Sequence, residues 1–389
     1  MDIALVLETS GGGSGRHVLD IAEAFVEMGH RVTVFWSAVR AEPGFVARLT
    51  ALEDVKQVEV AMQRAVGLAD IGQYLALRKA LKAHGPFDVI HAHSSKAGAL
   101  VRLDPMPVAP VCVYTPHALR TMDPDISAMA SAVYGRIEKL LSRRSDMIIS
   151  VSAAERDHAV DLGIDSQRIK VVANGARPAS GFDRAAARKT MAVDGDTFVV
   201  GFAGRLVGQK DPLRFVDAIA EAATHIANVR GVIMGDGELM DAAQQRAQGA
   251  PVTFMGWCDA PALMAGLDVL CVTSRYEALP YTFLEALHAG IPIVSADVGG
   301  VAETVIDGKT GIVVPVNSTG KEFAQALATL ADSETRAAYC AAAATLAKAR
   351  TVTAMAEATL DVYRAAGAPD GPQAVAETPT SLERLESST

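Results

Sequence analysis

The sequence lacks a long apolar run, although half of its 389 residues are hydrophobic. No stretch approaches the roughly 18 consecutive apolar residues that a membrane-spanning helix requires. The opening residues, MDIALVLETS, contain no basic segment and lead directly into a strand pattern, so we expect no signal peptide. These absences predict a cytoplasmic protein in which no part of the chain crosses a bilayer.

Cysteine and positive charge are also scarce. The four cysteines, Cys112, Cys258, Cys271 and Cys340, are scattered without the pair spacing of a disulfide framework. Because three of them lie in or beside apolar runs, we expect reduced thiols in the core. The 36 basic residues are outnumbered by 45 acidic ones, which leaves a net charge of −9. That balance argues against nucleic acid as a general partner.

No internal repeat is apparent, and the chain instead shows strand–helix–strand units. The first runs from a strand at Ile3–Leu7 through the glycine run Ser10–Gly15 to a helix at His17–Met28 and a strand at Arg31–Trp36. A dinucleotide fingerprint needs glycines in the order G-x-G-x-x-G, and this run fails that test in every frame. No acid closes the second strand to hold a ribose either. We therefore expect the glycines to let a phosphate or a sugar approach the backbone.

Histidines lie at the ends of the next two strands. The strand Phe87–His93 ends in His91 and His93, and the strand Val111–Thr115 is followed by His117. Ligands of open α/β sheets sit beyond the carboxyl ends of the strands, so His93 and His117 are candidates for substrate contacts. His91 and His93 have a spacing that a metal could use, but no third ligand is evident. We therefore expect no metal site.

The pattern restarts in the second half, after a linker-like segment at Ala176–Asp183. Thr197–Ala203 is a strand, and Pro212 opens a helix. The glycine-containing loop between them carries Arg205 and Lys210. Two fixed cations at such a place can neutralise a leaving diphosphate.

The most informative stretch is Ser274–Val298, which comprises a strand end, a tight loop, a short helix and another strand. Pro280 fixes φ where the helix can begin, and Gly290 suits its end. Glu277 precedes the helix and Glu285 lies inside it, with seven residues between them. The N–H groups of the first helical turn lack intrahelical partners and favour a phosphate. Carboxylates beside such a spot can accept hydrogen bonds from sugar hydroxyls.

Glu277-x7-Glu285, followed by Ala-Leu-His-Ala-Gly-Ile-Pro-Ile-Val, resembles the signature of the retaining GT-B glycosyltransferases of family 4. The loop from Gly204 to Lys210 is similar to the G-R-L-x-x-x-K loop of that family. VIHAHSSKAG and YTPHALR resemble the members that build bacterial surface polysaccharides, such as lipopolysaccharide. Asp211 and Ala278 depart from the pattern, because the family commonly has glycine at both positions. The resemblance covers nearly all of the chain except its last residues.

The resemblance implies catalytic roles for His117, Arg205, Lys210 and Glu277. It implies substrate binding by residues of the loops around the cleft, namely Gly12, Gly13, His93, Gly204, Trp257, Ala278, Leu279, Pro280, Tyr281 and Glu285. The matching histidine of relatives reaches the donor sugar or the acceptor. Trp257 stacks on the nucleobase or, alternatively, packs in an ordinary interface. Neither a cofactor nor a metal is implied.

The resemblance also implies an α/β fold of the GT-B type, with two Rossmann-like domains facing across an interdomain cleft. We expect an N-terminal, acceptor-side domain at 1–177 and a C-terminal, nucleotide-sugar-binding domain at 178–351. A crossover helix at about 352–366 joins the first domain. The remainder, 367–389, has little to bury and is expected to be a disordered tail.

The implied reaction is that of a metal-independent, hexosyltransferase-type enzyme. It moves a sugar from a nucleotide-sugar, expected to be a UDP-sugar, to a glycan or lipid-linked acceptor with retention of anomeric configuration. Two Asp-x-Asp strings, Asp123–Asp125 and Asp194–Asp196, are interpreted as turns rather than metal ligands. A sugar-nucleotide epimerase of the same architecture is the alternative, and a non-enzymatic sugar-nucleotide-binding protein is a third.

The segment from Ile126 to Arg144 predicts a helix that mixes apolar and basic residues, among them Arg136, Lys139 and Arg143. One interpretation is a solvated helix face. The other is a peripheral surface that lies against anionic lipid on the cytoplasmic side of the inner membrane, since the family often acts on lipid-linked acceptors.

Overall fold

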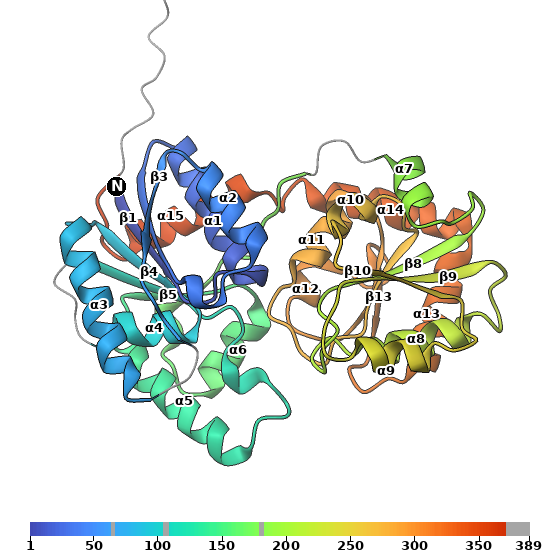
Figure 1. The fold of residues 1–389 in the computed structure, drawn as a ribbon, viewed down its shortest axis with the longest axis horizontal. Helices are drawn as coiled ribbons and strands as arrows, with labels where there is room; N and C mark the ends of the chain where they lie inside the picture. The colour runs from blue at the N-terminus through green and yellow to red at the C-terminus, as the bar shows by residue number, and fades with distance from the viewer. Residues whose placement is uncertain (64–66, 104–108, 179–182, 371–389) are drawn as a thin grey trace, which may run out of the picture. The chain divides into compact units, whose positions relative to one another are not determined.

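The computed structural model describes residues 1–63, 67–103, 109–178 and 183–370, whose strands form two parallel sheets (Figure 1). The chain divides into two compact units. One comprises Met1–Thr115, Arg143–Ile148 and the residues from Thr359 onward, and the other comprises Pro116–Ser142 and Ile149–Ala358. The centre of the predicted linker, 179–182, and most of the predicted tail, 371–389, lie outside the described residues.

The first sheet has seven strands in the order β3-β2-β1-β4-β5-β6-β7. They are β1 (Asp2–Leu7), β2 (Arg31–Trp36), β3 (Val55–Glu59), β4 (Val89–His93), β5 (Val111–Thr115), β6 (Met147–Ser150) and β7 (Ile169–Val171). The inner strands are buried on both faces, which explains why β1 is a continuous apolar run rather than an alternating one. The order reverses between β1 and β4, which are hydrogen-bonded neighbours.

Helices α1 and α2 lie on one side of these strands and α3 and α4 on the other (Figure 1). The helices of this part of the chain are α1 (Gly12–Glu27), α2 (Pro43–Ala51), α3 (Ala69–His84), α4 (Ser95–Arg102), α5 (Ala128–Ser142) and α6 (Ala153–Asp161), with short 3-10 turns η1 (Ala38–Arg40), η2 (Arg120–Met122) and η3 (Ser166–Arg168). Helix α1 begins inside the glycine run, five residues before the predicted start at His17.

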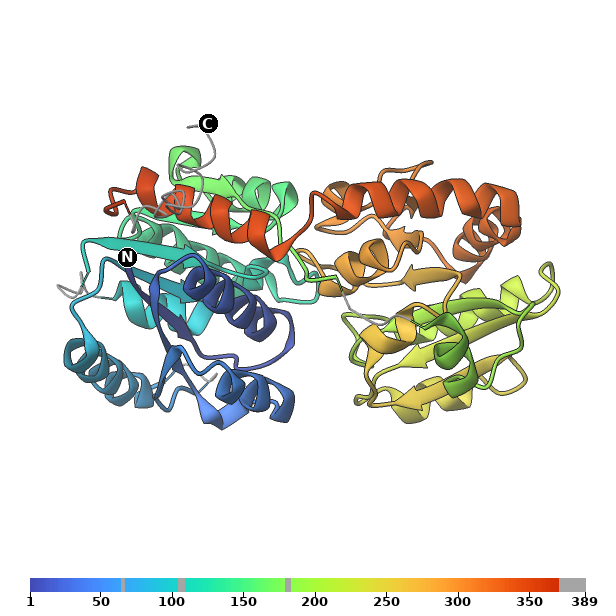
Figure 2. The same cartoon turned by 90° about the horizontal axis from the view of Figure 1, so that it is seen from above.

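The last helix, α15 (Val352–Ala365), coloured red in Figure 2, ends against the first sheet. The Tyr363 hydroxyl lies 2.7 Å from His91 Nδ1. The Tyr363 ring also packs on Phe25 of α1, with ring centroids 5.8 Å apart. The C-terminal part of α15 is therefore held to the N-terminal strands by a buried polar contact as well as by packing.

The second sheet has six strands in the order β10-β9-β8-β11-β12-β13. They are β8 (Phe198–Ala203), β9 (Val229–Met234), β10 (Val252–Gly256), β11 (Val269–Val272), β12 (Ile293–Ala296) and β13 (Gly311–Val314). Alternate residues of β8 enter two different cores. Phe198, Val200 and Phe202 join one cluster of buried side chains, and Val199 joins the other.

Helices α8, α9 and α13 cover one side of this sheet, and α10 and α11 cover the other (Figure 1). The helices of this half are α7 (Arg184–Thr190), α8 (Pro212–Ala222), α9 (Met240–Arg246), α10 (Ala260–Met264), α11 (Tyr281–His288), α12 (Val301–Thr304), α13 (Gly320–Ala331) and α14 (Ser333–Ala347). None of the helices in the described part of the chain is long and apolar enough to cross a bilayer.

Candidate functional site

The second sheet reverses its strand order between β8 and β11, and the candidate residues of this half gather there. β8 and β11 pair directly, with Val200 opposite Val269. The chain leaves β8 toward β9 and leaves β11 toward β12, on opposite sides of the pair. Such a reversal opens a crevice beyond the carboxyl ends of the two strands. The loop that carries Arg205 and Lys210 and the loop that carries Glu277 flank this point.

Hydrogen bonds tie these two loops together. The Thr273 hydroxyl donates to the carbonyls of Lys210 and Asp211 at 3.1 and 2.8 Å. Gln209 Nε2 donates to the Tyr276 carbonyl at 3.2 Å, and the Arg275 N–H donates to the Gln209 carbonyl at 2.8 Å. The loops are therefore held as one piece, which fixes the separation of the charges that they carry.

Lys210 and Glu277 form the central contact of the site. Lys210 Nζ lies 2.5 Å from Glu277 Oε1, and the two side chains are 18% and 7% exposed. Arg205, in contrast, is exposed to solvent. The structure thus brings two of the predicted catalytic residues into direct contact. Because the pair keeps some exposure, Lys210 can exchange its carboxylate partner for a ligand anion.

The segment Ala278–Tyr281 turns from this contact into α11. Its four residues are buried, and Pro280 is the N-cap, with φ −67°. Glu285, on the second turn of the helix, is also buried, with 8% of its surface exposed. The N–H groups of the first turn carry positive partial charge, and this turn follows directly after Glu277, the partner of Lys210.

Glycines allow the neighbouring loops to press against this segment. A Cβ on Gly299 would lie 2.1 Å from the Glu277 carbonyl oxygen, and one on Gly300 would lie 2.6 Å from Leu279 Cα. On the other side of β8, a Cβ on Gly235 would lie 2.0 Å from the oxygen of Gly204. Any larger residue at these positions would displace the backbone of the site.

The two positions that depart from the family pattern behave differently. Asp211 takes the left-handed conformation, with φ 49° and ψ 63°, that a glycine would adopt easily. Its carboxylate caps α8 by accepting the Arg214 N–H at 3.1 Å, which offsets part of the cost. Ala278 is not among the residues of positive φ. Alanine at this position therefore does not impose a strained φ.

Trp257, proposed for the nucleobase, follows β10 and is 74% exposed. Its indole is largely uncovered, and both interpretations, stacking on a base and packing in an interface, stay predictions. The exposed ring remains a candidate platform for a base.

The first sheet also has a reversal, between β1 and β4, where the glycine run and His93 lie. Gly12 and Gly13 are exposed. The Gly12 N–H donates to Glu42 Oε2 at 3.0 Å, and a Cβ on Gly11 would meet the same carboxylate group. Glu42 thus supplies an anion at the start of α1. A phosphate bound by these glycines would have to displace it.

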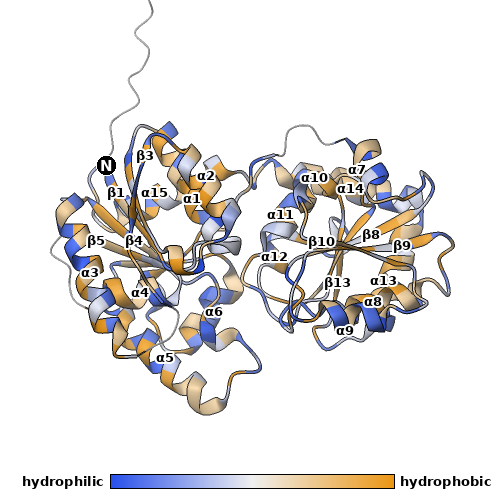
Figure 3. Cartoon of the chain, in the orientation of Figure 1, coloured by the Kyte–Doolittle hydropathy of each residue, from blue (hydrophilic) through white to orange (hydrophobic). Residues whose placement is uncertain are grey.

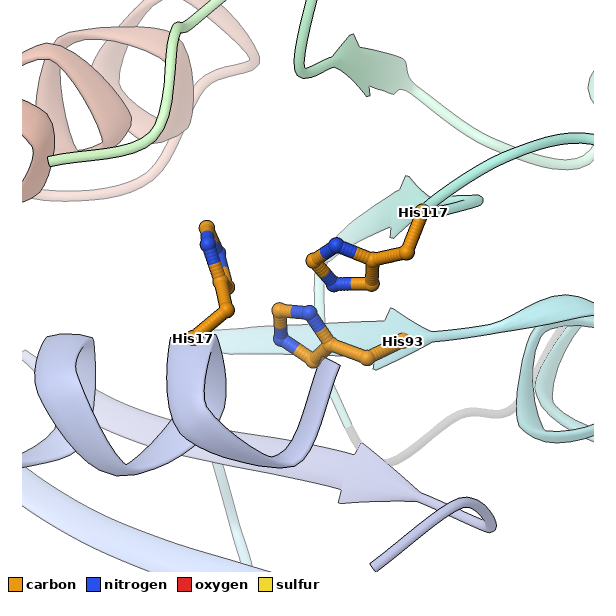
Figure 4. A group of neighbouring side chains, drawn as sticks. All are labelled: His17, His93 and His117. Carbon is orange, nitrogen blue, oxygen red and sulfur yellow. The ribbon is translucent and has the colours of Figure 1, made fainter. Parts of the chain in front are cut away.

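Three imidazoles gather at the carboxyl edge of the first sheet. The ligand atoms of His17, His93 and His117 lie within 4.8 Å of one another, and Figure 4 shows the rings turned toward each other. Imidazole nitrogens ligate Zn²⁺ and also hydrogen-bond sugar hydroxyls, so both roles fit this donor set. From the sequence, the spacing of His91 and His93 was one that a metal could use, but no third ligand was evident. The structure instead groups His93 with His17 and His117.

His91 has a structural role. Its ring nitrogens lie 2.7 Å from the hydroxyls of Thr115 and Tyr363, and the residue has no exposed surface. Burial lowers the pKa of His91 well below its usual value, which keeps the imidazole neutral between two hydroxyl partners.

The Asp-x-Asp strings take part in turns and ion pairs. Asp123 accepts from Arg120 at 3.0 Å and from the Asp125 N–H at 3.0 Å, and Asp125 pairs with Arg275 at 2.5 Å. Residues 194–196 are exposed between α7 and β8, at the amino end of the strand. The first string therefore contacts the β11–α11 loop through Arg275, and its carboxylates are engaged in a turn and an ion pair, whereas the second lies away from the reversal between β8 and β11.

Sequence reasoning missed His17 and Glu42. His17 sits on the second turn of α1, and its position after the glycine run was the available signal, because that run ends at the same edge of the sheet. Glu42 is 30 residues from Gly12 and follows no motif, so nothing in the sequence pointed to it.

Two family models match the chain. The model of Glycosyltransferase Family 4 matches residues 11–179, and that of Glycosyl transferases group 1 matches residues 197–333. An uncharacterized 41.2 kDa protein in the cps region of Klebsiella pneumoniae is 31% identical over 261 residues, which cover 64% of this chain and 70% of that protein.

A second relative is the UDP-Gal:alpha-D-GlcNAc-diphosphoundecaprenol alpha-1,3-galactosyltransferase of Escherichia coli. It is 27% identical over 285 residues, or 69% of this chain and 72% of the enzyme. Among solved structures, Anabaena Alr3699/HepE in complex with UDP and glucose matches with a TM-score of 0.79 at 22% identity. The match covers 94% of this chain and 100% of that one. At this identity the structural match shows the shared fold.

We predict that the left-handed conformation of Asp211 makes this position unusually sensitive to alanine. Asp211→Ala loses the cap and places in the left-handed region a residue that tolerates it less well than aspartate, and should cost about 2 kcal/mol of unfolding free energy. Asp211→Gly loses the cap alone and should cost about 1 kcal/mol less. Urea unfolding measures both. Asp259, which caps α10 at φ −76°, is the matched control. An equal alanine–glycine difference at 211 and 259 would contradict the prediction.

Proposed function

Since the chain belongs to glycosyltransferase family 4 and has the GT-B fold, we propose that it transfers a hexose from a UDP-sugar to a glycan or lipid-linked acceptor, with retention of configuration. The observation that carries the proposal is the Lys210–Glu277 contact, 2.5 Å long, at the reversal between β8 and β11. A cation and a carboxylate beside a helix N-terminus suit a substrate that combines a diphosphate with a sugar.

In the proposed reaction the bond between the anomeric carbon and the diphosphate oxygen breaks first. Lys210, Arg205 and the first turn of α11 stabilise the negative charge that develops on the leaving diphosphate. Glu277, released from Lys210, accepts hydrogen bonds from the transferred sugar. The acceptor oxygen then bonds to the anomeric carbon from the face that the diphosphate leaves. Its proton passes to a phosphate oxygen, which completes the transfer with retention.

The remaining residues are assigned to binding. Glu285 contacts the ribose hydroxyls, Trp257 stacks on the uracil, and His93 and His117 contact the sugar or the acceptor. The choice of a UDP-sugar is supported by the name of the Escherichia coli relative and by the UDP bound to the Anabaena protein. The name of the same relative supports an acceptor carried on a diphosphate-linked lipid, and hence a role in surface polysaccharide biosynthesis.

A peripheral contact with an anionic membrane is part of the proposal, and α5 supplies the surface for it. Five large hydrophobic side chains of this helix are exposed, Tyr134 and four without a polar group, and much of α5 is coloured hydrophobic in Figure 3. The four follow a helical spacing that puts them on one face: Met129 (79% exposed), Val133 (48%), Ile137 (43%) and Leu140 (62%). Basic residues interleave with this stripe, as in helices that lie on anionic lipid.

The transferase and its division of labour are tested by product analysis and two substitutions. With a panel of UDP- and GDP-sugars and a lipid-linked acceptor, we expect transfer from a UDP-sugar. Glu277→Gln should lower kcat about 100-fold with little change in donor affinity, because its contact develops in the transition state. Glu285→Ala should mainly weaken UDP binding in calorimetry. An epimerised nucleotide-sugar in the absence of acceptor would support the epimerase, and UDP-sugar binding without turnover would support a binding protein.

Turnover should not require a divalent metal. Arg205 and Lys210 together supply about two positive charges where a metal would neutralise the diphosphate. We therefore expect EDTA-treated enzyme to retain most of its activity, whereas Arg205→Ala and Lys210→Ala each lose about 100-fold or more in kcat. Arg246→Ala, which removes an exposed arginine paired with Asp217, is the control. Activity lost in EDTA and restored by manganese would refute this mechanism.

Membrane attachment is tested with vesicles. The wild-type protein should co-sediment with vesicles that contain phosphatidylglycerol and much less with purely zwitterionic ones, because the basic side chains favour anionic lipid. Ile137→Asp with Leu140→Asp should reduce binding about tenfold while donor hydrolysis is unchanged. Ile71→Asp with Leu75→Asp, exposed apolar residues of α3, is the control. Equal co-sedimentation of all three proteins would exclude α5 as the contact.

A further inference from the structure

The loop that carries His117 has an unfavourable backbone conformation. His117 and Ala118, which follow β5, have φ values of 56° and 78°. Two consecutive residues other than glycine rarely adopt the left-handed region, because their Cβ atoms crowd the backbone. Such a conformation persists only where the surrounding structure holds it. A neighbouring group must therefore stabilise this turn.

Glu155 of α6 is that group. It has no exposed surface, and its Oε1 accepts the Ala118 N–H at 2.7 Å. Its Oε2 accepts the N–H of Val151, just after β6, at 2.9 Å. The Leu119 N–H also favours the ionised carboxylate. One buried carboxylate thus joins the His117 loop to the end of the neighbouring strand, in the manner of an anion bound by consecutive backbone N–H groups.

The surroundings of Glu155 disfavour the ionised form of its carboxyl group. Burial, as the largest effect, raises the pKa of Glu155 to about 7, and the nearby Glu138 of α5 also raises it, while the three backbone N–H groups lower it. Other titratable groups of this region include His117 in the loop, Arg156 and His158 on α6, and Glu303, which accepts the Ala153 N–H at 2.5 Å. The His158 ring lies 2.7 Å from the Thr121 hydroxyl. Burial therefore disfavours the ionised carboxylate, and the hydrogen bonds it accepts come from backbone N–H groups. Such contacts fix the conformation of the backbone that they join.

We propose that Glu155 is a positioning residue for sugar transfer. Its carboxylate holds the left-handed turn at His117–Ala118, and so aims the His117 imidazole without touching the substrate itself. This inference rests on the proposed function, in which His117 contacts the donor sugar or the acceptor. Glutamine cannot replace the carboxylate, because it offers one acceptor oxygen and would turn an NH₂ donor toward a backbone N–H.

The test compares Glu155→Gln with Glu138→Gln at about pH 8, where the carboxylate of Glu155 is ionised. A displacement of about 1 Å can lower a rate about 100-fold. For Glu155→Gln we expect kcat to fall by 10- to 100-fold, with UDP affinity in calorimetry unchanged. Glu138→Gln, which removes the buried acid of α5 that acts on Glu155 through its charge, should behave as wild type. Equal losses in both variants, or lost UDP affinity in Glu155→Gln, would overturn the inference.

A second readout does not depend on turnover. The His117 ring resonance, assigned in ¹H–¹³C spectra by its absence in His117→Ala, should shift in Glu155→Gln and stay in place in Glu138→Gln. If Glu155→Gln does not fold, Glu155→Asp keeps the charge with a shorter reach and should show the same shift. An unmoved resonance would refute the positioning role even if the enzyme transfers sugar. A shifted resonance in a protein without transferase activity would refute the proposed function alone.

Discussion

The reversal of strand order between β8 and β11 is the constraint on which the second half of the molecule depends. Two strands separated by about 70 residues of sequence become direct neighbours, and the chain leaves them in opposite directions. Their loops can therefore stand beside each other without either one filling the space above the strands. The Lys210–Glu277 contact, the start of α11 and the hydrogen bonds of Thr273 all follow from this one adjacency.

Around this point the site is built largely from backbone. Gly299, Gly300 and Gly235 let the loops that follow β12 and β9 approach those that follow β11 and β8 within distances that a Cβ would forbid. Asp211 is an exception, because it adopts the left-handed conformation that glycine favours. Its hydrogen bond to the start of α8 offsets part of the cost of that conformation. In the first half of the chain a side chain, rather than its absence, stabilises a loop. The buried Glu155 carboxylate accepts hydrogen bonds from backbone N–H groups and so holds a turn that contains no glycine. In both halves the residues that hold the loops matter as much as those that face a ligand.

Much of the fold and part of the site were predictable from local patterns. The two sets of parallel strands follow from apolar runs and glycine turns. Arg205, Lys210, Glu277 and Glu285 lie within loops and a helix whose motif spans a few residues each. The family was recognised from these motifs and is confirmed by the family models. Helix α1 was predicted to begin at His17 and begins at Gly12, because the Glu42 carboxylate supports the N–H of a glycine that has no helix propensity of its own.

The sequence by itself determined which segments become strands, which loops carry charge, and that acids bracket a helix start, because these properties depend on residues within a turn or two of each other. The tertiary structure alone decided the rest. It grouped His93 with His17 and His117 rather than with His91, engaged His91 with Thr115 and Tyr363, and brought Glu155 to the N–H of Ala118, 37 residues away. Each of these contacts depends on how strands pair and helices pack. The spacing of the residues along the chain does not determine that arrangement, so it could not predict the contacts.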